Sequence, residues 1–234
     1  MRKNREVDRI SLSYLNLQTP KENRGNIIVF FLVTLDLIGV LPILAYPFSY
    51  KFFIAAIIPV ACLHLWAIIY VIAPYRYERS YYLFFGIYGL INTYIYFLVI
   101  QKLLYNHLLI QDSKAFIAGI IFLIALIIFM NWLNIRFLYS GTYVNLQEKK
   151  TSKKVAPITA AAGLGYVIAQ LVLTFVYSVS IKMAILIIVL SILSVVTAYF
   201  STFIHRYFFI LKNEEIVKKV RPEFGLPKKM RKNI

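Results

Sequence analysis

Residues 27–50 read IIVFFLVTLDLIGVLPILAYPFSY, and this stretch decides the class of the fold. At about 1.5 Å per residue, a helix of this length can cross a hydrocarbon core about 30 Å thick. The stretch also carries Asp36 near its middle and two prolines, Pro42 and Pro47, toward its end. A charged side chain at the centre of a bilayer costs at least about 2.5 kcal/mol. We therefore expect Asp36 to face a polar partner, water or the interior of a helical bundle.

Five more apolar runs follow the first. Hydrophobic residues make up 60% of the 234 residues and charged residues only 15%, so the chain has more apolar surface than a soluble core of this size can hide. The sequence predicts an all-α polytopic integral membrane protein with six transmembrane helices. The runs are Ile27–Phe48, Phe52–Ala73, Tyr81–Ile100, Ala115–Leu133, Ile158–Val179 and Met183–Ile204.

The basic residues indicate how the helices are oriented. With the amino terminus inside, 22 of the 26 Lys and Arg residues fall in predicted cytoplasmic segments, which is the asymmetry typical of membrane proteins. We therefore expect both termini in the cytoplasm and the chain in the plasma membrane. The net charge of +16 lies in short segments between apolar runs, so nucleic acid is not an expected partner. The outer basic residues are Lys51, Lys102, Lys114 and Lys182.

Three parts of the chain are distinguished: a leader (1–26), a transmembrane domain (27–204) and a basic tail (205–234). The leader fits an interfacial helix as well as a disordered segment, and residues 19–26 are expected to form a polar linker. The last helix is expected to continue past the membrane until Pro222 stops it, with an extended basic tail beyond. The helical spacing in the leader comes from Val7, Ile10, Tyr14 and Leu17.

Two clusters of basic residues are candidates for contact with anionic lipid head groups or with a protein partner. That partner is a separate cytoplasmic ATPase or another membrane subunit. The candidate contact residues are Lys149, Lys150, Lys153, Lys154, Lys218, Lys219, Arg221, Lys228 and Lys229.

Asp36 and a histidine on the next helix are expected to form a pair. Counting along the helices places Asp36 about 13 Å and His64 about 12 Å from the cytoplasmic boundary. The two helices are joined by a short turn, so they run antiparallel as neighbours. We predict that Asp36 and His64 face each other inside the bundle. A buried carboxyl paired with a histidine can exchange a proton.

Other residues near the middle of the predicted helices are interpreted as glue between helices or as part of the same polar site. Small residues at regular spacing predict close helix packing, and the prolines of the first two helices free backbone carbonyls that polar groups must satisfy. The polar residues are Asn92, Gln170, Ser191 and Ser194, and the packing residues are Gly86, Gly89, Ala161, Gly165 and Ala169.

The sequence carries no motif of a known chemistry. It has no P-loop, HExxH or GxSxG pattern, three scattered histidines and a single cysteine, Cys62. We therefore expect no metal, no cofactor and no catalysis. The leading hypothesis is a non-catalytic multi-pass protein, either the permease-like or accessory component of a transport system or an immunity (self-protection) protein. The alternatives are a proton-coupled transporter that uses Asp36 and His64, and an intramembrane enzyme acting on lipid or peptide.

Overall fold

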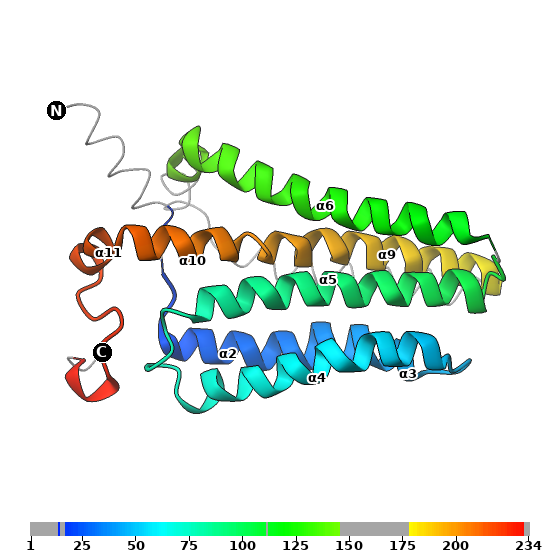
Figure 1. Cartoon of the computed structure of the whole chain (residues 1–234), viewed down its shortest axis with the longest axis horizontal. Helices are drawn as coiled ribbons and strands as arrows, with labels where there is room; N and C mark the ends of the chain where they lie inside the picture. The colour runs from blue at the N-terminus through cyan, green and yellow to red at the C-terminus, as the bar shows by residue number, and fades with distance from the viewer. Residues whose placement is uncertain (1–13, 15–16, 111, 146–177, 232–234) are drawn as a thin grey trace.

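The computed structural model describes residues 14, 17–110, 112–145 and 178–231, and within these ranges every regular element is helical (Figure 1). The predicted all-α, polytopic membrane architecture is confirmed. The predicted run Ile158–Val179 lies almost entirely outside the described residues. Five helical segments in the described part of the chain are long and apolar enough to cross a membrane: Pro20–Leu44, Tyr50–Ile72, Tyr81–Asn106, Ser113–Tyr139 and Val179–Lys212.

The first span begins earlier than the sequence pattern predicts. Helix α2 (Pro20–Phe30) starts inside the expected polar linker, so the linker prediction is wrong. The Thr19 side chain accepts a hydrogen bond from the Glu22 backbone N–H, and the Glu22 side chain accepts one from the Thr19 N–H. This capping box, with proline at the first helical position, is the local signal that identifies the start.

The middle of the first span is a π-helix. Element η1 (Phe31–Val40) contains Asp36 and leads into the short helix α3 (Leu41–Leu44), after which the chain becomes extended at Ala45. π-Helical turns are rare and are frequently found at functional sites. The irregular backbone therefore coincides with the charged residue that the sequence singles out.

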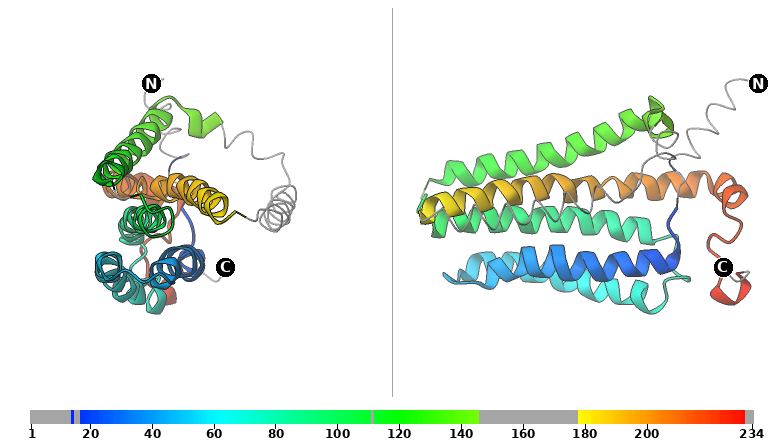
Figure 2. Two further views of the ribbon diagram at one scale, coloured as in Figure 1. Left: turned by 90° about the vertical axis from the view of Figure 1, so that its right-hand side faces the viewer. Right: turned by 180° about the vertical axis from the view of Figure 1, so that it is seen from behind.

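Helix α5 (Tyr81–Asn106) is the central element of the bundle. Helices α2, η1, α3 and α4 (Tyr50–Ile72) lie on one side of it, and α6 (Ser113–Tyr139) and α9 (Val179–Phe200) lie on the other (Figure 2). Aromatic side chains of α5 fill the space between these layers. Fully buried among them are Tyr81, Tyr82, Phe84, Tyr88 and Tyr96.

Two glycines allow α5 to approach α9 and the start of α10 (Phe203–Lys212) closely. A Cβ built on Gly86 would lie 2.5 Å from Ile204 Cγ1, and one built on Gly89 would lie 2.7 Å from Phe200 Cβ. Only a residue without a side chain fits at either position. Both glycines therefore lie at close contacts between helices. Ala161, Gly165 and Ala169 lie outside the described residues.

The carboxyl-terminal segment folds back on the bundle. The helical continuation is confirmed: α10 (Phe203–Lys212) and α11 (Glu214–Val220) follow α9, with a break at Asn213. The extended tail predicted beyond Pro222 is wrong, because the chain turns there and buries Phe224 to 1% exposure. A short 3-10 helix η2 (Lys228–Met230) follows. Helix α2 begins at the end of the bundle where this segment folds. We call this end of the bundle the tail end.

Candidate functional site

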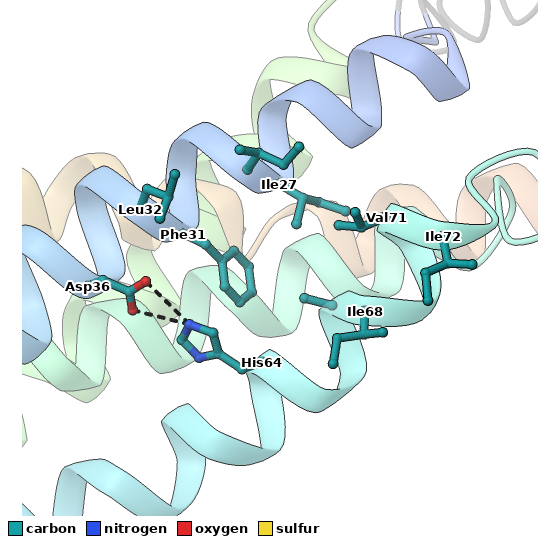
Figure 3. Close-up of a pocket in the computed structure, with 10 residues that line it drawn as sticks. Ile27, Phe31, Leu32, Asp36, His64, Ile68, Val71 and Ile72 are labelled. Carbon is teal, nitrogen blue, oxygen red and sulfur yellow. Dashed lines mark hydrogen bonds and ion pairs between the residues drawn. The ribbon is translucent and has the colours of Figure 1, made fainter.

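Asp36 and His64 are in contact across the first helical hairpin. The His64 imidazole Nε2 lies 3.2 Å from Asp36 Oδ1 and 3.4 Å from Oδ2, with Asp36 on η1 and His64 on α4 (Figure 3). The Phe31 ring packs edge-on against the imidazole, with 5.0 Å between ring centroids. The contact predicted from helix depth is therefore present.

The second imidazole nitrogen limits how the pair can be protonated. His64 Nδ1 lies 2.9 Å from the backbone oxygen of Val60, and a carbonyl oxygen can only accept, so Nδ1 donates. In a neutral imidazole Nε2 is then an acceptor that faces the carboxyl group. The contact is favourable only if one proton lies between Nε2 and Asp36, on either group. The pair is thus a site for one shared proton and has no net charge.

The pair lies in a groove that opens on the membrane-facing surface. Its side chains keep 41% exposure at His64 and 37% at Asp36, so the expectation that both point inside the bundle is wrong. The physical reason is that α5 already fills the interior of the bundle. The two side chains therefore lie on the side of the hairpin that faces away from α5. The groove has a volume of about 300 Å³ and is otherwise apolar. Its walls are Ile27, Ile28, Phe31 and Leu32 of the first span and Ala67, Ile68, Val71 and Ile72 of α4.

Polar side chains of α5 bind the backbone behind the pair. The Tyr88 hydroxyl donates to the carbonyl oxygen of Phe30 at 3.0 Å, and the Tyr96 hydroxyl donates to that of Thr34 at 2.8 Å. Asn92 Nδ2 donates to Thr34 Oγ1 at 3.4 Å. Asn92 is therefore placed beside η1, as part of a network that holds the π-helix. Asn92 bonds to Thr34 and not to Asp36 or His64.

The two candidate serines belong neither to the Asp36–His64 groove nor to the network that holds η1. Ser191 Oγ donates to the carbonyl oxygen of Ile187 at 2.7 Å, and Ser194 Oγ donates to that of Leu190 at 2.8 Å, so each hydroxyl bonds to its own helix. They line a small cavity of about 90 Å³ between α5, α6 and α9 on the far side of α5. The structure does not bring them to the Asp36–His64 groove. Gln170 lies outside the described residues.

Lys102 is an important residue that the sequence analysis misplaces. The hydrophobic pattern places it in an outer connection, but α5 continues to Asn106 and the Lys102 side chain is 2% exposed. Its ammonium group donates to the carbonyl oxygens of Pro42 at 2.8 Å, Ile43 at 2.9 Å and Ala45 at 2.6 Å. An ammonium has three donors, and here all three have acceptors. Lys102 thereby caps the carboxyl end of α3.

Two of the carbonyls freed by prolines are satisfied from α5. Pro47 cannot donate to the Ile43 oxygen, which Lys102 binds instead. Pro59 lies inside α4 and cannot donate to the Ala55 oxygen, which accepts from the Tyr94 hydroxyl at 3.3 Å. The expectation that polar neighbours satisfy such carbonyls is confirmed at these two positions.

Glu78 is a second residue that the sequence analysis missed. It lies between α4 and α5 with its side chain fully buried, and it accepts from Arg231 Nη2 at 2.5 Å and from the Gly225 backbone N–H at 2.8 Å. Arg221 lies 3.8 Å from Glu78 and also donates to the backbone oxygens of Leu17 and Gln18. The buried carboxylate of Glu78 thus joins the segment after α11 to the connection between α4 and α5.

Further contacts complete the tail end. Burial raises the pKa of the Tyr14 hydroxyl to about 12, and this hydroxyl accepts from Asn134 Nδ2 at 3.0 Å. Glu214 Oε1 lies 2.9 Å from Lys218 Nζ and 2.5 Å from Arg79 Nη2. The hydrogen bond from Lys218 and the charge of Arg79 hold the pKa of the Glu214 carboxyl below its usual value. These contacts join Tyr14 to α6 and join α11 to the connection between α4 and α5.

The basic residues predicted to contact lipid or a partner differ in their surroundings. Arg221 is used within the protein, as described above. Lys218 bonds to Glu214 and keeps 52% side-chain exposure. Lys219, Lys228 and Lys229 are exposed. Lys149, Lys150, Lys153 and Lys154 lie outside the described residues, as does the leader except for Tyr14, Leu17 and the residues that follow.

Comparison with protein-family models, with curated proteins and with solved structures finds no match for this chain. Its function is therefore inferred from the geometry described above.

Proposed function

We propose that this protein is a non-catalytic accessory subunit of a membrane transport or self-protection system, and that it acts by binding another protein. It lies in the plasma membrane with six spans and both termini in the cytoplasm. The excess of basic residues in the predicted inner segments supports this orientation. The contacts that join Tyr14, Leu17 and Gln18 to the carboxyl-terminal segment support placing both ends on one side.

One observation carries the proposal: the Asp36–His64 pair, predicted to lie near mid-membrane depth, is on the surface of the bundle. A self-contained carrier needs its coupling groups beside a path through the protein, yet here α5 fills the interior with buried rings. A carboxyl group that faces hydrocarbon is costly unless another molecule covers it. A subunit that meets its partner in the membrane satisfies this requirement.

Affinity purification from membranes in a mild detergent tests the proposal. We expect the full-length chain to be recovered with a second protein in a fixed ratio. The purified chain alone, reconstituted in liposomes, is expected to show no flux driven by a proton gradient. Recovery of the chain alone from several mild detergents would contradict the proposal.

The second candidate is the proton-coupled transporter, which the shared proton of Asp36 and His64 favours. It predicts that the purified chain alone transports a substrate in liposomes and that Asp36→Asn abolishes this flux while the protein still inserts and folds. The intramembrane enzyme has less support. Both ring nitrogens of His64 already have partners, Val60 and Asp36, and neither is a nucleophile that the histidine activates.

A further inference from the structure

We propose that the Asp36–His64 groove receives one transmembrane helix of a partner protein, and that a lysine or arginine of this helix binds Asp36 near the middle of the membrane. This inference rests on the proposed function and names the surface and the chemistry of the partner.

The shape of the groove fits a helix. From His64 to Ile72 the wall formed by α4 extends about 12 Å along the helix, which is a little more than two turns. The opposite wall follows the first span from Asp36 back to Ile27. Figure 3 shows the aliphatic side chains of both walls along one side of the pair. Several remain open to the membrane: Leu32 is 60% exposed, Ile68 49% and Ile72 77%.

The depth of the polar group favours a helix over a lipid. A phospholipid keeps its head group at the membrane surface, so an acyl chain in the groove would bring hydrocarbon to Asp36 and leave the carboxyl group without a second partner. A transmembrane helix can carry apolar side chains along both walls and one polar side chain at the level of Asp36. Polar residues inside membrane helices commonly pair in this way.

The open acceptor sites of the Asp36 carboxyl group favour a cation as its second partner. Asp36 is the only acidic residue in the six apolar runs, and within the described residues its carboxyl group pairs with a single donor, His64 Nε2. An ionised carboxylate has about four acceptor sites, and the exposed side of Asp36 leaves some of them open. A lysine or arginine that binds there takes the place of the shared proton, which leaves for the water phase. The complex of cation, carboxylate and neutral imidazole then has no net charge.

Photo-crosslinking in membranes tests the contact. A photo-reactive amino acid is placed at Leu32 or Ile68, which line the groove, and at Ile121 of α6 as a control that is 63% exposed outside it. We expect crosslinks to a second protein from Leu32 and Ile68 and none to that protein from Ile121. Mass spectrometry should place the crosslink in an apolar segment of about 20 residues with a lysine or arginine near its middle.

Substitutions provide a second readout. Leu32→Trp fills the groove and leaves Asp36 and His64 intact, whereas Ile121→Trp adds the same bulk on α6. We expect Leu32→Trp and Asp36→Asn each to reduce the recovered partner about tenfold, with Ile121→Trp unchanged. Equal expression and a single elution peak for all three variants exclude misfolding as the cause of the loss.

The two proposals fail in different ways. If the partner is still recovered with Leu32→Trp, or if Leu32 and Ile68 crosslink only to lipid or to residues 158–179 of the same chain, the groove assignment is wrong and the accessory role stands. A crosslinked segment without a lysine or arginine near its middle also overturns the assignment. If no partner is recovered with the unmodified chain, both proposals are wrong.

Discussion

Replacing Lys102 by methionine tests how the first hairpin is held. Methionine has a similar length and an unbranched apolar chain, so it preserves packing and removes the ammonium group. The three carbonyl oxygens of Pro42, Ile43 and Ala45 then lose their donor. An unsatisfied buried polar group costs about 1–3 kcal/mol, and removal of a desolvated charge offsets part of the total, so we expect a net loss of about 3 kcal/mol.

The melting temperature in detergent measures this loss. For a chain of this size each kcal/mol shifts the midpoint by about 2–4 °C, so Lys102→Met should melt about 6–12 °C lower. The matched control is Lys114→Met, because the Lys114 side chain lies near the same end of the bundle and is 89% exposed. Hydrogen exchange should also increase in residues 41–49 of the Lys102 variant only. Equal melting temperatures for the two variants would refute the role assigned to Lys102.

Gly89→Ala should force α5 away from α9 and destabilise the protein by about 1–3 kcal/mol. Gly25→Ala is the control, because a Cβ at Gly25 meets nothing within 4 Å and should cause no such loss. Equal melting temperatures for the two variants would contradict this expectation. Arg231→Ala should release the carboxyl-terminal tail from Glu78 and speed the cleavage of the tail by trypsin. Lys229→Ala alters an exposed lysine and should not speed this cleavage. Equal protection of the tail in both variants would show that the Arg231–Glu78 contact does not hold it. The pKa of the Glu214 carboxyl is lowered in the folded protein, so its ion pairs stabilise the fold above the ordinary pKa and are lost as the pH falls through the lowered value. The difference in melting temperature between the native chain and Glu214→Gln should therefore disappear on acidification, and a pH-independent difference would contradict the ion-pair role.

The contact between Asp36 and His64 could be predicted from the sequence because their relative level depends only on the rise of a helix and on the short turn between two spans. The direction of their side chains could not. It depends on the π-helical turn in η1 and on which neighbour occupies the interior. Neither is encoded in the hydrophobic pattern, which shows where a helix enters the membrane and where it leaves.

The missed residues have a common cause. Lys102 and Glu78 are charged residues beside apolar runs, and such residues are usually solvated, so the pattern predicts exposed connections for both. Their partners are backbone oxygens of the first hairpin for Lys102 and tail residues for Glu78, all distant in the sequence. Only the folded chain shows that each charge is buried and paired. The missed start of α2 differs, because its capping box is visible in the sequence at Thr19 and Glu22.

The prolines, the π-helix and the groove form one structural unit that α5 holds from behind. Tyr96 binds the Thr34 oxygen within η1, Tyr94 binds the Ala55 oxygen in α4, and Lys102 binds the end of α3. The bonds from Tyr94 and Lys102 satisfy carbonyl oxygens that have no helical donor, and the bond from Tyr96 adds a contact to η1, so the hairpin can keep an irregular shape inside the membrane. All of these bonds are on the α5 side, and the groove on the opposite side is lined by the Asp36–His64 pair, the Phe31 ring and aliphatic side chains. A hairpin fixed on one side and open on the other is suited to binding a second molecule without itself rearranging.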